Sequence, residues 1–207
     1  MRRVLLTGFE PFAGAPANPS WDAIELLLQS TVFDAEVVSR RLPVAFGSGA
    51  RRLLEHVTAH TPDVVIAVGV AEGRRAVTPE LVAINYRNAR IPDNKGRQPI
   101  DSPVVPGGEP AYFSTLPVHE IVAELDTQGI PAEVSLSAGS FVCNDTFYAL
   151  QRSLVGLGVS SGFIHVPATT HMKLNDDVPV MPLGQIAKAL GVAVNVTLAS
   201  RASTIAP

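Results

Sequence analysis

The 207-residue chain has a single cysteine, Cys143, and a single tryptophan. One cysteine cannot form an intrachain disulfide, so the fold does not depend on oxidation, and we expect an intracellular, cytoplasmic protein. Charged residues are also scarce, at 17% of the chain against about 25% in a typical domain. The net charge is −3 and no basic patch stands out, so nucleic acid is not expected to be the main partner.

Long apolar runs are missing as well. The longest stretch without a charged residue, from Ser153 to Met172, contains glycines, a proline and two histidines, which makes it a poor membrane span. The apolar run near the N-terminus covers only Val4–Leu6, which predicts a first buried strand instead of a signal peptide. His56 and His60 are four residues apart but have no third metal ligand near them. We therefore expect no membrane partner and no metal.

Short apolar runs alternate along the chain with amphipathic segments. Strands are expected at residues 3–7, 36–42, 64–68, 76–86, 132–136 and 161–166, and helices at residues 20–29, 48–60, 117–128, 146–154 and 183–201. Ser20 is expected to cap the first helix, and Gly191 to interrupt the last. Pro79 suits an edge strand or a sheet extension. The alternation predicts one domain over residues 1–207, an α/β fold with a three-layer α/β/α arrangement and an open, twisted, largely parallel (mixed) sheet.

The segment around Cys143 connects a predicted strand to a predicted helix. Asn144 or Asp145 could cap this helix, because a short polar side chain can accept hydrogen bonds from its free backbone N–H groups. A helix N-terminus favours a thiolate, so Cys143 is a candidate nucleophile. Taken alone, a single cysteine is better explained as a small buried apolar residue.

A cysteine nucleophile needs a base, and the base needs a group that orients it. His165 is the best candidate base, because it ends a predicted buried strand, where the carboxyl ends of α/β sheets face a ligand crevice. His119 and His171 are weaker candidates, since they lie in a helix start and a loop.

The orienting group should be a carboxylate in an apolar setting. Glu80 precedes an apolar run and fits best, whereas Glu10 and Asp93 are rivals. A cation for the oxyanion could come from any of four arginines: Arg74, Arg75, Arg87 or Arg90.

Taken together, five segments resemble the pyroglutamyl peptidase I family, also called pyrrolidone-carboxylate peptidases. The matching segments are residues 7–12 (TGFEPF) with 18–21 (NPSW), Glu80 with 83–85 (AIN), 89–94 (ARIPDN), 137–144 (SAGSFVCN) and 162–167 (GFIHVP). They follow the family order over residues 5 to about 167, and the joint pattern is specific although each fragment alone is modest.

The resemblance implies a cysteine peptidase that removes N-terminal pyroglutamate from peptides through a thioester intermediate. It implies an α/β/α fold, no metal and no cofactor, and bacterial members are commonly homotetramers. Cys143 matches the family nucleophile, His165 its base, Glu80 the acid that orients the histidine, and Arg90 a residue near the oxyanion. The positions that match the surroundings of the pyroglutamyl ring are Phe9, Phe12, Ile91, Phe141 and Val142.

The chain departs from the family pattern at Val70 and Glu72, in a loop that often reads Gly-Gln/Leu-Ala-Gly-Gly-Arg, and at Asp145. These differences concern substrate preference more than reaction type. One alternative is another Cys-His-Glu amide hydrolase of the glutamine-amidotransferase type, although its usual Gly-x-Cys-x-Gly pattern is missing around Cys143. A second alternative is a phosphate- or nucleotide-binding module that uses the loop at residues 8–14, which lacks the usual glycine spacing.

Overall fold

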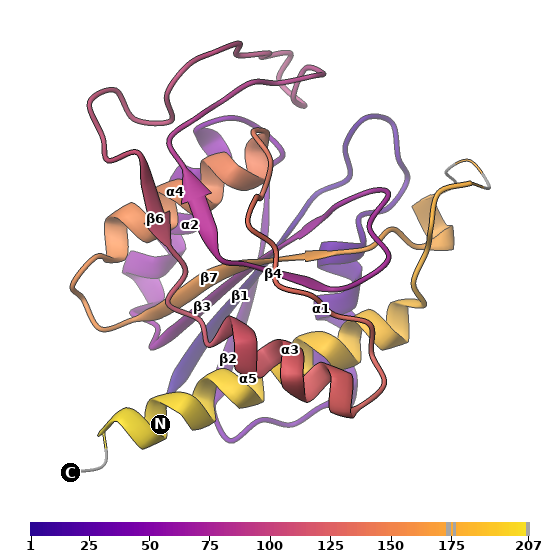
Figure 1. Ribbon diagram of the computed structural model, residues 1–207, viewed down its shortest axis with the longest axis vertical. Coiled ribbons are helices and arrows are strands. Elements are labelled where there is room, and N and C mark those ends of the chain that lie inside the picture. Colours follow the sequence, from indigo (N-terminus) through magenta and orange to yellow (C-terminus); the bar gives the residue numbers. More distant parts are fainter. Residues whose placement is uncertain (173–174, 176, 206–207) are drawn as a thin grey trace.

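Five strands form the central sheet in the order β2-β1-β3-β7-β4 (Figure 1). The computed structural model describes residues 1–172, 175 and 177–205. The strands are β1 (Arg3–Phe9), β2 (Glu36–Leu42), β3 (Val64–Val70), β4 (Thr78–Glu80) and β7 (Ser160–Val166). The first four in spatial order are parallel, and β4 is antiparallel to β7 at the edge. The predicted mixed, largely parallel sheet is therefore confirmed, including the edge position of Pro79.

Helices cover both faces of this sheet. On one face lie α1 (Pro19–Ser30), α3 (Val118–Thr127) and α5 (Leu183–Ile205), and on the other α2 (Ser48–His60) and α4 (Val142–Leu154). The strand side chains alternate between the two layers: Val4 and Leu6 pack in the α1/α3/α5 core, and Leu5 packs in the α2/α4 core. A sheet buried on both faces explains why its strands are continuous apolar runs.

The last helix, α5, is not interrupted at Gly191 as predicted. Gly191 lies inside the helix and next to α1, where an added β-carbon would come 3.1 Å from Leu27 Cδ1. The glycine thus permits close helix packing instead of a break. The stretch Leu183–Arg201 is long and apolar enough to cross a membrane by length and composition, and half of it is buried inside the protein.

Two predicted strands differ from the observed ones. Residues 76–86 divide into β4 and β5 (Val82–Ile84), and β5 pairs with β6 (Ala111–Phe113) in a separate two-stranded sheet. Residues 132–136 are not a strand; they form isolated bridges at Val77–Ala132 and Glu80–Ser135. Backbone hydrogen bonds connect residues 131–135 with residues 77–81, but Pro79 has no N–H to donate, so the ladder is interrupted between the two bridges.

Two helices begin earlier than predicted. Asn18, not Ser20, caps α1, and its Oδ1 accepts a hydrogen bond of 3.1 Å from the Ser20 N–H. Helix α4 begins at Val142 with Phe141 at the N-cap, and no side chain caps it. Neither Asn144 nor Asp145 serves as the cap, because both already lie inside the first turns of α4. Cys143 is therefore part of the first turn and not in the preceding loop.

Candidate active site

A small cavity lies where the carboxyl ends of the parallel strands meet the N-terminus of α4. Phe9 at the end of β1, Val70 at the end of β3 and His165 near the end of β7 all line it, together with Cys143. Ligands of open α/β sheets bind at this edge. The cavity measures about 140 Å³, below the roughly 300–1,000 Å³ typical of drug-sized ligands, so it suits a single small ring.

Cys143 occupies the second position of α4, and its sulfur lies against the backbone of β3. A β-carbon at Gly69 would come 2.9 Å from Sγ and 2.8 Å from the Phe163 ring, so this approach requires glycine. Val142 and Cys143, the first two residues of α4, line the cavity, and their N–H groups have no acceptor within the helix. Gly69 and His165 are register partners on β3 and β7, so the sulfur beside Gly69 lies at the same edge of the sheet as His165, and both line the cavity.

The pKa of the Cys143 thiol is raised to about 12, chiefly by burial and then by the negative charge of Glu80. Its own backbone N–H and the charge of Arg74 act in the opposite direction but do not outweigh these effects. Burial therefore favours the neutral thiol in the substrate-free protein, against the preference of a helix N-terminus for a thiolate. The thiol needs a base to remove its proton.

His165 and Glu80 form a buried hydrogen-bonded pair. The distance from His165 Nδ1 to Glu80 Oε1 is 2.7 Å, and Glu80 is completely buried. They face each other because Thr78 and Glu80 of β4 run antiparallel beside His165 and Phe163 of β7. A carboxylate acceptor places the proton of a neutral imidazole on Nδ1 and leaves Nε2 free to accept another.

The charge states of this pair follow from their surroundings. Burial lowers the pKa of His165 below its usual value and outweighs the opposing effect of Glu80, so the imidazole is neutral near pH 7. Burial would raise the pKa of Glu80, but His165, the Ser135 hydroxyl and Arg74 together hold it below its usual range. The pair thus combines a carboxylate with a neutral imidazole, as a general base requires.

The four candidate arginines differ in their hydrogen-bond partners. Arg74 donates to Glu80 Oε1 at 2.7 Å and to the Ser137 carbonyl at 2.9 Å. Arg87 instead binds Asp145, with 2.6 Å between Nε and Oδ1. The side chains of Arg75 and Arg90 are exposed, and neither has a hydrogen-bond or ion-pair partner among the described residues.

The rival carboxylates and histidines have other positions. Glu10 accepts from the Val44 N–H and from Asn94, whereas the carboxylate of Asp93 accepts from three backbone N–H groups. His119 and His171 are exposed. In the described part of the chain, none of these groups contacts Cys143 or the His165–Glu80 pair.

Four of the five residues expected around the substrate ring line the cavity: Phe9, Phe12, Phe141 and Val142. The rings of Phe12 and Phe141 pack against each other, with their centroids 6.4 Å apart. Ile91 does not line the cavity. The remaining lining residues were not among the predicted site residues: Asn18, Val44, Val70 and residues 138–140.

Two larger hollows, of about 780 and 710 Å³, lie elsewhere on the surface. One is lined by the segment after β6 and by the end of α4, and the other by α2 and α4. Their described linings contain no cysteine and no histidine, so neither can carry out nucleophilic chemistry by the same means. No group of three His, Cys, Asp or Glu side chains suited to a metal occurs within the described residues.

The arrangement can perform acyl transfer. It contains a buried thiol beside free helix N–H groups, a neutral imidazole in the same cavity, and a carboxylate that orients the imidazole. Among the described residues, Cys143 and His165 are not hydrogen-bonded to each other. Such contacts are often long before a substrate binds.

Comparisons with known proteins point to one family. A sequence profile described as pyroglutamyl peptidase matches residues 2–200. A pyrrolidone-carboxylate peptidase of Erwinia tasmaniensis is 47% identical over 200 residues, which is 96% of this chain and 94% of the relative. That of Clavibacter michiganensis is 48% identical over 201 residues, or 97% and 94% of the two chains.

Solved structures agree with the sequence matches. The crystal structure of pyroglutamyl peptidase I from Bacillus amyloliquefaciens superposes with a TM-score of 0.92 at 42% identity, covering 97% of this chain and 98% of the other. A mutant pyrrolidone carboxyl peptidase from Pyrococcus furiosus gives a TM-score of 0.90 at 39% identity, covering 96% and 99%. The similarity therefore extends over the whole fold and not only over the cavity.

Proposed function

The chain belongs to the pyroglutamyl peptidase family, and from this premise we propose that Cys143 is the nucleophile with which it removes N-terminal pyroglutamate from peptides. The enzyme is a hydrolase of the pyrrolidone-carboxylate peptidase type. The observation that carries the assignment of residues is the 2.7 Å hydrogen bond between Glu80 and His165, beside the Cys143 thiol.

In the first step, His165 Nε2 removes the proton of the Cys143 thiol as Sγ attacks the pyroglutamyl carbonyl carbon. The neutral imidazole can accept this proton, and Glu80 stabilises the imidazolium that forms. A new C–S bond replaces the carbonyl π bond, so the negative charge moves to the carbonyl oxygen.

The oxyanion needs donors at the N-terminus of α4. The Cys143 N–H has no partner in the helical ladder and can donate to it. Arg90 is the proposed second group, because its exposed guanidinium can turn toward a bound peptide. His165 then gives its proton to the leaving amine, the C–N bond breaks, and water hydrolyses the thioester with His165 again as the base.

The cavity explains a preference for the cyclic residue. Its walls are largely apolar, with Phe9, Phe12 and Phe141 among them. Pyroglutamate is an uncharged lactam and enters such a site at low desolvation cost, whereas the ammonium of an N-terminal glutamine would be left without a partner.

Purified protein should release the fluorophore from a pyroglutamyl-coumarin amide and leave the glutaminyl analogue intact. Cys143→Ser should lower kcat/KM by at least about 10³-fold, because the hydroxyl is a far weaker nucleophile in this setting. Circular dichroism of the variant serves as the folding control. Activity of Cys143→Ser within tenfold of the wild type would remove Cys143 from the role of nucleophile.

We also propose a cytoplasmic homo-oligomer, a tetramer, that acts on peptides with N-terminal pyroglutamate. The unpaired cysteine supports a reducing compartment. Exposed apolar side chains near the end of α4 and on β6, namely Phe113, Val155 and Leu157, support subunit contacts. Light scattering tests the subunit number, and cell fractionation tests the compartment.

A further inference from the structure

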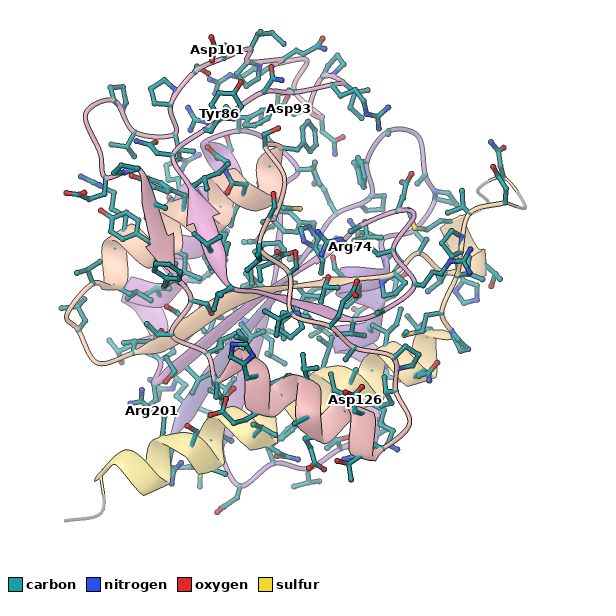
Figure 2. All side chains as sticks on the ribbon, in the orientation of Figure 1. Arg74, Tyr86, Asp93, Asp101, Asp126 and Arg201 are labelled. Carbon is teal, nitrogen blue, oxygen red and sulfur yellow. The ribbon has the colours of Figure 1, made fainter. Side chains whose placement is uncertain are left out.

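Arg74 lies in the loop between β3 and β4, and its guanidinium reaches three groups at the edge of the active site. It donates to Glu80 Oε1 at 2.7 Å, to the Ser137 carbonyl at 2.9 Å, and also to the Thr78 hydroxyl. Figure 2 labels Arg74 in this loop, beside the β4 edge of the sheet. None of these contacts is with the proposed reacting atoms, so any role in catalysis passes through the partners of Arg74.

The first such partner is Glu80, which accepts from His165 and Arg74 with the same oxygen. A completely buried carboxylate needs a compensating charge to remain ionised. His165 does not supply it in the resting enzyme, because burial keeps the imidazole neutral. Arg74 is the permanent cation in contact with Glu80 among the described residues, and only 26% of its side chain is exposed.

The second partner belongs to the cavity wall. Ser137 begins the segment whose next residues, 138–140, line the cavity before Phe141 and the start of α4. This segment is not part of a strand or helix, and Ser137 itself is exposed. The hydrogen bond from Arg74 therefore connects the loop after β3 to an otherwise irregular wall.

We propose that Arg74 is a positioning residue that holds Glu80 ionised and oriented toward His165 and at the same time fixes the 137–140 wall of the cavity. This inference rests on the proposed function of Cys143, His165 and Glu80. It predicts two separable effects of Arg74, one through its charge and one through its second hydrogen bond.

The charge effect has a definite sign. The charged groups that act on Cys143 and His165 are Glu80, from β4, and Arg74, from the β3–β4 loop. A cation disfavours proton binding, and Arg74 lowers the pKa of the thiol and of the imidazole. Removal of Arg74 should therefore raise both pKa values, and also that of Glu80.

The experiment compares Arg74→Ala, which removes the charge, with Arg74→Lys, which keeps it but loses the forked geometry. Arg75→Ala is the matched control, because it removes an equal charge from an exposed neighbour that has no partner in the described structure. If Arg74→Ala does not fold, Arg74→Gln removes the charge with less loss of volume. Each protein is measured for the pH dependence of kcat/KM on a pyroglutamyl-coumarin amide.

A second measurement does not depend on peptidase activity. The rate at which neutral iodoacetamide alkylates Cys143 reports the thiolate fraction, and the single cysteine makes the signal unambiguous. If the wild type releases no fluorophore, the proposed function fails, and alkylation still tests whether Arg74 controls the thiol.

For Arg74→Ala we expect about a 100-fold loss of kcat/KM, because a small misplacement of a catalytic group has this effect. We expect the acid limb of the profile to move up by about half a pH unit, and alkylation below the thiol pKa to be about threefold slower. Arg74→Lys keeps the positive charge, so the acid limb of its pH profile should match that of the wild type. It loses the second hydrogen bond to the cavity wall, so its KM should rise. A folded Arg74→Ala or Arg74→Gln whose acid limb and alkylation rate equal those of Arg75→Ala would overturn the proposal.

Discussion

Two buried arginine–carboxylate ion pairs lie near Cys143, the proposed nucleophile, and they differ in their surroundings. Arg74 binds Glu80, and Arg87 binds Asp145, two residues after Cys143. Both carboxylates are completely buried, and both arginines are partly exposed. The difference lies in the other groups that each carboxylate contacts.

Glu80 also accepts from His165, a group that changes its protonation during the proposed reaction. Asp145 accepts instead from the Gly47 N–H at the start of α2, and Arg87 in turn contacts the Pro103 carbonyl. In the proposed reaction the first pair acts on proton transfer, whereas the second pair connects α4 to α2 and to the segment between β5 and β6. The proposal thus assigns chemistry to the pair whose carboxylate also contacts a titratable group, and stability to the other.

Glu80→Gln should give the largest effect. The amide has no charge to stabilise imidazolium, and its N–H₂ group favours the wrong tautomer of His165. We expect kcat/KM to fall about 10⁴-fold, as in other enzymes where the orienting acid is replaced by its amide. The measurement is the pH profile of kcat/KM on a pyroglutamyl-coumarin amide.

The control for Glu80→Gln is its stability in urea, because a loss of activity through unfolding would mean nothing about orientation. Glu80→Gln leaves Arg74 without its ionic partner and is expected to lose unfolding free energy, so the urea curve must show that the variant is folded at assay temperature. A variant that is folded and retains more than a tenth of wild-type kcat/KM would show that Glu80 does not orient the base.

Asp145→Asn should affect mainly stability. Removal of one partner leaves Arg87 largely buried and unpaired, with 18% of its side chain exposed, and breaking such pairs costs about 3–5 kcal/mol of unfolding free energy. The acid limb of kcat/KM in the protein that remains folded should equal that of the wild type, because Asp145 does not contact His165. Urea unfolding measures the first quantity and the pH profile the second.

Arg87→Lys is the matched control for this pair, since it keeps the charge and loses the forked hydrogen bonds. It should destabilise less than Asp145→Asn. If instead Asp145→Asn moved the acid limb as much as Arg74→Ala does, proximity to Cys143 alone would explain both, and the comparison between the pairs would fail.

The alternation of apolar strands with helices could be read from the sequence, because strands buried on both faces need continuous apolar runs. The strand expected at residues 132–136 is less apolar, since it contains Glu133 and Ser135, and it lies beside Pro79, which has no N–H to donate, so it forms two isolated bridges. Composition indicates the tendency to be extended, but a continuous ladder also needs an unbroken row of N–H donors on the neighbouring strand.

The side-chain partners of Arg74 and Arg87 could not be predicted from the sequence. Glu80 lies only 6 positions from Arg74, but the Ser137 carbonyl lies 63 positions away, and Asp145 lies 58 positions from Arg87, so the tertiary fold decides these contacts. Val44 and Val70 could have been found, because each lies at or just after the carboxyl end of a parallel strand, where ligand crevices form. The raised pKa of Cys143 could not, because it depends on burial.

A third buried carboxylate extends the comparison, because Asp93 is held without an arginine hydrogen bond. Its oxygens accept from the backbone N–H groups of Phe46, Lys95 and Arg97 at 2.8–2.9 Å. Burial would raise the pKa of Asp93, but these three donors outweigh it and hold the pKa below its usual value. Backbone dipoles here replace the guanidinium that Glu80 and Asp145 require.

Asp93→Asn should therefore lower the unfolding free energy by about 2 kcal/mol at pH 7, the contribution typical of hydrogen bonds to a charged acceptor. A carboxylate with a depressed pKa stabilises the fold above its unfolded pKa, about 4, and this contribution is lost as the pH falls through the folded value. The difference in stability between the wild type and Asp93→Asn should thus begin to shrink as the pH falls below about 4 and should vanish only below the folded pKa of Asp93, with Asp93→Glu as the charge-retaining control. Urea unfolding from pH 3 to 7 measures the difference. A constant gap over this range would mean that Asp93 contributes through shape and not through its charge.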